Sequence, residues 1–153
     1  MNHTRILAVD DEPLNLAIIE EYLCEEPNYT LDTAQDGECA WTALEGTAKP
    51  YDLVILDRMM PVLDGMALLS RMKADARFAD IPVIMQTAAA APEQVREGMA
   101  AGAYYYLTKP YEPETLCAVV RAAIGDRHAL RSALSRAESL DGAFQQLTEV
   151  EFR

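Results

Sequence analysis

Five short, mostly apolar runs alternate along this chain with five segments of helical pattern, and this alternation constrains the fold more than any other feature. The runs cover residues 5–9, 29–34, 53–56, 82–85 and 103–107. Short apolar runs of this kind are typical of strands in a parallel sheet that is covered by helices on both faces. Because strands and helices alternate throughout, we expect an α/β fold with five parallel strands.

Each helical segment begins at a recognisable signal. Pro13, Pro92 and Pro113 fit a first helical turn, where a missing N–H costs nothing. Asp36 is expected to cap the second helix, and Asp64-Gly65 to form a turn before a third helix over 66–74. The apolar stripes expected to face the sheet are Leu14, Ala17, Ile18 and Leu23 in the first helix, Cys39, Ala40, Ala43 and Leu44 in the second, and Leu116, Val119, Val120 and Ala123 in the fifth.

Carboxylates follow two of the apolar runs directly. Asp10 and Asp11 come after the run 5–9, and Asp57 comes after the run 53–56. The carboxyl ends of parallel strands meet at one edge of the sheet, and open α/β sheets bind their ligands there. Three clustered carboxylates repel one another unless a hard cation lies between them, and oxygen ligands favour magnesium or calcium. The sequence therefore predicts a site for Mg²⁺ and a phosphoryl group.

Composition narrows the functional class further. With 153 residues the chain is long enough for one domain with a short appendage. Its net charge of −12 argues against direct nucleic-acid binding, since no cluster of lysine and arginine is available to neutralise phosphates. No apolar stretch approaches the roughly 20 residues that span a bilayer, so we predict no membrane contact and a cytoplasmic location.

Three cysteines, Cys24, Cys39 and Cys117, lie in apolar helical patterns without pairing signals. An odd number at uneven spacing favours buried free thiols in a reducing compartment over disulfides. Metal binding by these thiols is a remote alternative because the chain contains no C-x-x-C pair.

Taken in chain order, the polar motifs at the run ends form a known pattern. They are Asp10-Asp11-Glu12-Pro13, Asp57-Arg58-Met59-Met60-Pro61 with Asp64-Gly65, Thr87-Ala88, Tyr106 and Lys109-Pro110. Over about residues 4–124 this order closely resembles the receiver domain of two-component response regulators, the CheY-like superfamily. The resemblance implies a doubly wound, flavodoxin-like fold with strand order 2-1-3-4-5.

The resemblance also implies a phosphoacceptor site. Asp57 would attack the phosphorus of a phosphohistidine and carry the phosphoryl group as an acyl phosphate. Asp11 would bind Mg²⁺ directly and Asp10 largely through water, while Asp57 and the backbone carbonyl of Met59 would complete the protein ligands. Lys109, held by a cis bond to Pro110, would bring its ammonium to a phosphoryl oxygen.

Two further residues correspond to the family's switch. Thr87 would donate its hydroxyl to the new phosphate, and Tyr106 would turn inward into the space that Thr87 vacates. Tyr104, two residues before Tyr106, is expected on the same side of the strand. Met59 and Ala89 are apolar where fast self-dephosphorylating members carry polar groups, so we expect slow hydrolysis of the acyl phosphate.

The composition changes at Gly125-Asp126, which divides the chain into a receiver over 1–125 and a helical linker over 126–147. Apolar residues repeat every seven positions in this tail, as Leu130, Ala137 and Phe144 and as Ala133, Leu140 and Leu147. The seam favours either a coiled coil between two chains or one helix folded back on its own domain. Residues 148–153 alternate in a strand-like way, and we interpret them as the start of a further output domain.

Within the resemblance, the expected partner is a sensor histidine kinase or a histidine phosphotransfer protein, with a homodimer through the tail as one alternative. A stand-alone regulator or phosphorelay intermediate is the alternative to a receiver that drives an output domain. An enzyme of the haloacid-dehalogenase type is disfavoured because it needs a second aspartate two residues after the nucleophile, where Met59 stands. A purely structural dimerisation module is disfavoured by the complete set of polar motifs. We therefore predict a signalling domain rather than an enzyme.

Overall fold

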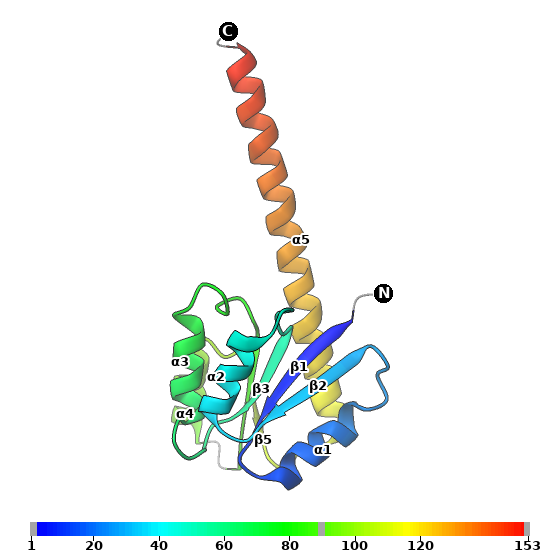
Figure 1. Ribbon diagram of the computed structural model, residues 1–153, viewed down its shortest axis with the longest axis vertical. Helices are drawn as coiled ribbons and strands as arrows, with labels where there is room; N and C mark the ends of the chain where they lie inside the picture. The colour runs from blue at the N-terminus through cyan, green and yellow to red at the C-terminus, as the bar shows by residue number, and fades with distance from the viewer. Residues whose placement is uncertain (1–2, 89–90, 152–153) are drawn as a thin grey trace.

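A computed structural model describes residues 3–88 and 91–151, and of residues 138–151 it describes the backbone alone. Five parallel strands form one sheet in the order β2-β1-β3-β4-β5 (Figure 1). The strands are β1 (Thr4–Val9), β2 (Tyr29–Ala34), β3 (Leu53–Asp57), β4 (Val83–Thr87) and β5 (Tyr105–Thr108). The fold class and the strand order predicted from the sequence are confirmed, with strand ends shifted by one or two residues.

Helices follow each strand, and most begin where the sequence signals stand. They are α1 (Pro13–Leu23), α2 (Gly37–Gly46), α3 (Gly65–Lys73), α4 (Pro92–Ala100) and α5 (Pro113–Glu151). Asp36 caps α2 by accepting a hydrogen bond from the backbone N–H of Cys39 at 2.7 Å, and Asp64 caps α3 through Ala67 at 2.8 Å. Each side-chain cap satisfies a backbone donor that the first helical turn leaves without a partner.

Two apolar layers cover the sheet, because alternate residues of each strand point to opposite faces. Helices α2, α3 and α4 pack on one face through residues such as Trp41, Leu68 and Met72. Helices α1 and α5 pack on the other through Leu16, Ile19 and Val120. Burying a side chain of this size contributes about 1.5–3 kcal/mol, so the two layers fix the sheet and hence the positions of its strand ends.

The buried stripe of α1 differs from the prediction. Leu16, Ile19 and Leu23 are buried, whereas Leu14 is 71% exposed and Ala17 is exposed. The helix begins at Pro13 with a rotation that turns Leu14 towards solvent, so the stripe lies one to two positions away from the expected one. Of the predicted stripe, Leu23 is buried and Ile18 is half-buried.

The cysteine prediction is also wrong in part. Cys24 and Cys39 are exposed, and Cys117 is half-buried. Cys24 follows the last turn of α1, in the turn that leads to β2. Cys39 lies in the first turn of α2 with its thiol towards the carboxylate of Asp36, on the solvent side of the helix. All three are free thiols, as expected from their number and spacing.

Helix α5 is the longest element, with 39 residues from Pro113 to Glu151. It crosses the sheet face, continues through Gly125 without a break and projects away from the domain (Figure 1). The helix therefore does not fold back onto the sheet. The strand-like interpretation of residues 148–153 is wrong for 148–151, which are helical, because a heptad helix propagates through a short alternating segment. Residues 152–153 lie outside the described residues, and a following output domain stays a prediction.

Candidate functional site

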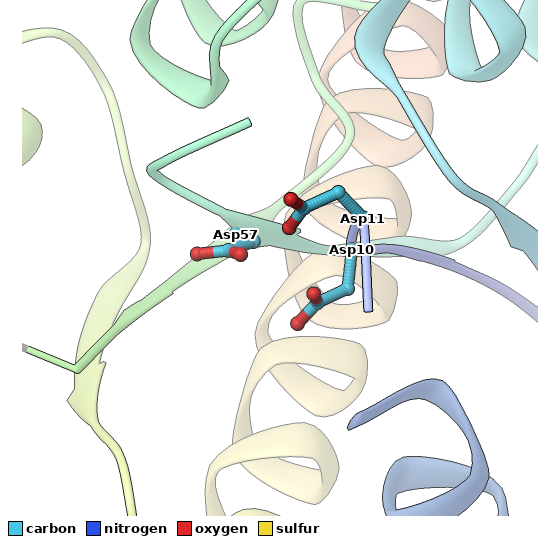
Figure 2. Close-up of side chains that lie close together, drawn as sticks. All are labelled: Asp10, Asp11 and Asp57. Atoms are coloured by element: carbon cyan, nitrogen blue, oxygen red, sulfur yellow. The ribbon is translucent and has the colours of Figure 1, made fainter. Parts of the chain in front are cut away.

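Three carboxylates converge at the carboxyl ends of the two central strands (Figure 2). Asp57 is the last residue of β3, and Asp10 and Asp11 directly follow β1, whose Val9 pairs with Leu56. One oxygen from each carboxylate lies within 4.8 Å of the others. Asp10 is fully buried and Asp57 is buried, while Asp11 is exposed. This oxygen-only set with one face open to water fits a cation such as Mg²⁺, which keeps several of its waters.

The ammonium of Lys109 lies beside two of the three carboxylates. The Lys109 Nζ lies 2.8 Å from Oδ2 of Asp10 and 3.6 Å from Oδ2 of Asp57. The backbone N–H of Lys109 donates to the carbonyl of Thr87 at 2.7 Å, which fixes the lysine at the end of β5 beside β4. The Lys109–Pro110 peptide bond is cis, as the resemblance implied. Lysine and acids therefore come together from three strand ends that are distant in sequence.

The environment of Asp57 favours its neutral form. Burial is the main cause and raises the pKa of Asp57 from 3.8 to about 6, with the ammonium of Lys109 opposing the shift and the charge of Asp10 adding to it. The backbone N–H of Met59 donates to Oδ1 of Asp57 at 3.3 Å and also favours the carboxylate. A bound cation would reverse this balance, because a divalent charge stabilises the ionised carboxylate.

Asp10 is oriented by a buried polar chain that sequence reasoning missed. Gln86, fully buried in β4, donates from Nε2 to Oδ2 of Asp10 at 3.3 Å and accepts at Oε1 from the hydroxyl of Tyr111. The backbone N–H of Glu12 donates to Oδ1 of Asp10 at 2.9 Å. Burial raises the pKa of Tyr111, so its hydroxyl stays protonated and remains a donor. A glutamine directly after the apolar run 82–85 was the available signal, since buried amides need partners.

The remaining predicted residues lie around this centre. Thr87 is buried at the end of β4, and Tyr106 is buried in β5 with its ring against α4. Met59 is 69% exposed in the loop after β3. Ala89 lies outside the described residues.

The expectation for Tyr104 is wrong. Tyr104 precedes β5 rather than continuing its alternation, and it packs on the α1 and α5 side while Tyr106 packs on the other. Its hydroxyl donates to Asp126 of α5 at 2.5 Å. No pair of aromatic side chains therefore forms on one side of this strand.

A family model for the response regulator receiver domain matches residues 6–121 of the chain. The chain belongs to this family. Among curated relatives, this receiver is 32% identical over 142 residues to Response regulator Rre1 of Synechocystis sp., covering 93% of the chain and 61% of the relative. It is 36% identical over 137 residues to the DNA-binding dual master transcriptional regulator RpaA of the same organism, covering 90% of the chain and 56% of the relative. The chain thus spans less than two thirds of these relatives.

Solved structures agree with the fold of the receiver. The chemotaxis protein CheY4 of Vibrio cholerae superposes with a TM-score of 0.72 at 30% identity, covering 78% of this chain and 98% of that protein. The BeF3-activated receiver domain of DrrB gives a TM-score of 0.71 at 29% identity and covers 82% of this chain and 99% of that domain. Receiver domains of two-component systems generally receive their signal from histidine kinases and bind Mg²⁺ at an acidic cluster. In the described part of the chain, no helix is both long and apolar enough to cross a bilayer.

Proposed function

We propose that this receiver accepts a phosphoryl group on Asp57 from a histidine kinase or a histidine phosphotransfer protein. The observation that carries the proposal is the convergence of three carboxylates and one ammonium at the carboxyl ends of β1, β3 and β5. This arrangement offers a nucleophile, a cation site and a counter-charge for a phosphoryl oxygen within one small volume. Similarity to the BeF3-activated DrrB domain supports the same chemistry.

The proposed metal ligands are Asp10, Asp11, Asp57 and the backbone carbonyl of Met59. The donor set fits Mg²⁺, because hard oxygen ligands and an exposed Asp11 leave room for coordinated waters. When bound, Mg²⁺ would offset the negative charge that builds up on the phosphoryl oxygens during transfer. The fully buried Asp10 is kept in position by Gln86 and by the backbone of Glu12.

In the transfer, a carboxylate oxygen of Asp57 attacks the phosphorus of the donor phosphohistidine in line with the leaving nitrogen. The new O–P bond forms as the P–N bond breaks, and the electron pair of the P–N bond stays on the imidazole nitrogen of the donor. Lys109 would move its ammonium from Asp10 to an oxygen of the transferred group, a shift of partner within the same cluster. Burial around Asp57 limits the access of water to the acyl phosphate.

The product would change the surface formed by α4, β5 and α5. Thr87 would donate to a phosphoryl oxygen, and the position of Tyr106 would report the change to α4. We propose that α5 carries the signal to an output domain, since the relatives Rre1 and RpaA extend well beyond the part matched by this chain. The chain, with a net charge of −12, is not proposed to bind nucleic acid.

Beyond its own phosphotransfer and a slow hydrolysis of the acyl phosphate, no catalytic turnover is proposed. The exposed side chain of Met59 has no group that could orient a water molecule for attack. A Met59→Asn variant should therefore shorten the lifetime of the acyl phosphate in the presence of Mg²⁺. A lifetime of seconds in the unmodified protein would contradict this part of the proposal.

The decisive experiment is labelling by acetyl phosphate with Mg²⁺, comparing the unmodified chain with Asp57→Asn. The mass should increase by one phosphoryl group only when Asp57 is present, and chelation of Mg²⁺ should abolish the increase. The matched control is Asp64→Asn. Asp64 is an exposed aspartate in the loop after β3, and its side chain caps α3. This variant should still be labelled. Undiminished labelling of Asp57→Asn would overturn the proposal.

The alternative is a stand-alone regulator, favoured by the near-complete coverage of the CheY4 chain. The tail distinguishes a stand-alone regulator from a receiver that drives an output domain. Leu130, Leu134 and Ala137 are exposed along α5 and could pair two chains. We propose a homodimer through this helix. Sedimentation with and without beryllium fluoride should give a dimer mass in at least one state, and a monomer in both would favour the stand-alone alternative.

A further inference from the structure

Arg58, the residue after the proposed phosphoacceptor, extends away from the carboxylates and reaches α4. Its Nη1 donates to the backbone carbonyl of Gln94 at 2.9 Å and to the hydroxyl of Tyr106 at 3.3 Å. Its Nη2 lies 2.8 Å from the carboxylate of Glu97. The side chain is only 14% exposed. One guanidinium therefore joins the end of β3 to α4 and to the switch tyrosine of β5.

The backbone of Arg58 is held as firmly as its side chain. Its N–H donates to the carbonyl of Gln86 at 2.9 Å, and its carbonyl accepts from the N–H of Gly65 at 2.9 Å. A Cβ added at Gly65 would lie 2.3 Å from the carbonyl oxygen of Asp57, so only glycine permits this approach. The base of the Arg58 side chain is thus held next to Asp57 by backbone contacts to β4 and to the start of α3.

Helix α4 has little else to hold it. Gly98 is its only buried residue, and Val95 adds a partly buried side chain. A helix with so small an apolar face gains little from burial, so polar contacts make a large share of its attachment. Two of the three side-chain bonds of Arg58 reach successive turns of α4, at Gln94 and Glu97. Arginine suits this task because its fork presents several donors in fixed directions, which lysine cannot do.

Tyr106 completes the unit. Its ring packs directly on Gly98, where an added Cβ would lie 2.8 Å from the ring. The ring fills the space beneath α4, and the hydroxyl ends at Arg58. The inward position of Tyr106 and the seating of α4 therefore depend on the same guanidinium.

We propose that Arg58 is a positioning residue that tethers α4 and holds Tyr106 inward, and thereby couples Asp57 to the α4 surface. The tether itself follows from contacts in the unphosphorylated protein. The coupling rests on the proposed function, because it requires a phosphoryl group or its mimic at Asp57. Linkage then demands that a variant which frees Tyr106 also binds the phosphoryl mimic more weakly.

The test compares Arg58→Met, which keeps an apolar stem but loses all donors, with Arg71→Met as matched control. Arg71 lies on the same side of the sheet, stacks on Trp41 at 4.1 Å and pairs with Glu38, and it forms no ion pair with α4 among the described residues. In the unliganded protein, amide hydrogens of α4 should exchange about tenfold faster in Arg58→Met, while those of α1 should not change. Arg71→Met should leave exchange in α4 unaltered.

Beryllium fluoride with Mg²⁺ then tests the coupling by calorimetry. Its affinity should fall about threefold to tenfold in Arg58→Met and in Tyr106→Phe, and the double variant should lose less than the product of the two factors. Unchanged exchange in α4 would overturn the tether. Faster exchange with unchanged affinity would overturn the coupling. Failure of the unmodified chain to bind the mimic would instead count against the proposed function and leave the exchange result as the test of the tether.

Discussion

The two ends of the sheet differ in the balance between acidic and basic side chains. At the carboxyl ends of the strands, Asp10, Asp11 and Asp57 lie together and the ammonium of Lys109 pairs with Asp10 and Asp57, so negative charge is in excess. At the amino ends, Arg127 of α5 lies buried between acids, 3.8 Å from Asp52 and 4.0 Å from Asp80. The unbalanced end is where a cation and a phosphoryl group are proposed to arrive, and the balanced end is where the long helix is anchored.

Anchoring by Arg127 is strong because the side chain is 3% exposed and donates to the backbone carbonyl of Tyr51. It is also imperfect, because the Nε of Arg127 is buried without a hydrogen-bond partner among the described residues. Burial lowers the pKa of the guanidinium, yet a guanidinium still stays charged at neutral pH. The comparison teaches that the charged groups at the base of α5 stabilise the fold, whereas the clustered carboxylates at the opposite end of the sheet lower its stability.

The largest expected effect comes from breaking the balanced end with Arg127→Met. The variant leaves Asp52 and the carbonyl of Tyr51 without their buried partner, and we expect a loss of about 2–4 kcal/mol in the free energy of unfolding. Urea unfolding followed by circular dichroism measures it. A loss below about 1 kcal/mol would mean that apolar packing of α5, rather than the charge pair, fixes the helix.

At the carboxyl end of the sheet, where negative charge is in excess, we expect a substitution to raise the free energy of unfolding rather than to lower it. The folded protein raises the pKa of Asp57 from 3.8 to about 6, so the folded state binds the proton more tightly than the unfolded state. Ionisation therefore costs stability as pH rises between these values, and the full cost is present at pH 7. Without metal, Asp57→Asn should gain about 1–3 kcal/mol at neutral pH, since one pKa unit is about 1.4 kcal/mol.

The pH profile provides the control for this gain. Below about pH 3 the carboxyl group of Asp57 is protonated in both states, so the advantage of the amide should vanish. Urea titrations of both proteins from about pH 3 to pH 8 in the presence of a chelator give the difference directly. A gain that is constant with pH would show that the amide stabilises by packing or hydrogen bonding rather than by removing charge.

Almost all of the charged residues at the carboxyl end of the sheet could be predicted from the sequence. Asp10, Asp11 and Asp57 each follow an apolar run, and parallel strands bring such positions to one edge without further information. Lys109 came from the family resemblance, and its distance of 2.8 Å to Asp10 agrees with that placement. These residues were predictable because the main chain of a parallel sheet alone decides where they lie.

The balanced end and the Arg58 tether could not be predicted in this way. Arg127 lies in a tail whose heptad pattern suggested a linker, and its burial depends on how α5 crosses loops before β3 and β4. Arg58 and Tyr106 meet through side-chain directions across 48 residues of sequence. The burial of Leu16 rather than Leu14 likewise depends on the rotation of α1 about its axis, which spacing leaves open.

A prediction with a smaller expected effect tests whether the backbone of the loop after β3, at the carboxyl end of the sheet, is strained. Val62, in the loop after β3, has φ of 70°, a left-handed conformation that a β-branched side chain disfavours. Its side chain is 86% exposed, so little packing is lost on substitution. Val62→Gly should stabilise the protein by about 0.5–1 kcal/mol in urea unfolding. Val62→Ala, which keeps a Cβ, should gain less, and equal gains would point to side-chain exposure as the cause.

The prediction with the smallest expected effect tests whether the ion pairing of an arginine or its burial determines stability. Arg77 has carboxylate partners, as Arg127 does, with Asp75 at 2.7 Å and Glu45 at 3.3 Å, but its side chain is 56% exposed. Water solvates both charges in the folded and the unfolded protein, so the pair gains little on folding. Arg77→Met should leave the urea midpoint unchanged within measurement error, in contrast to Arg127→Met. If the two variants destabilised equally, the number of ion pairs rather than their burial would determine stability, and the contrast between the two ends of the sheet would lose its physical basis.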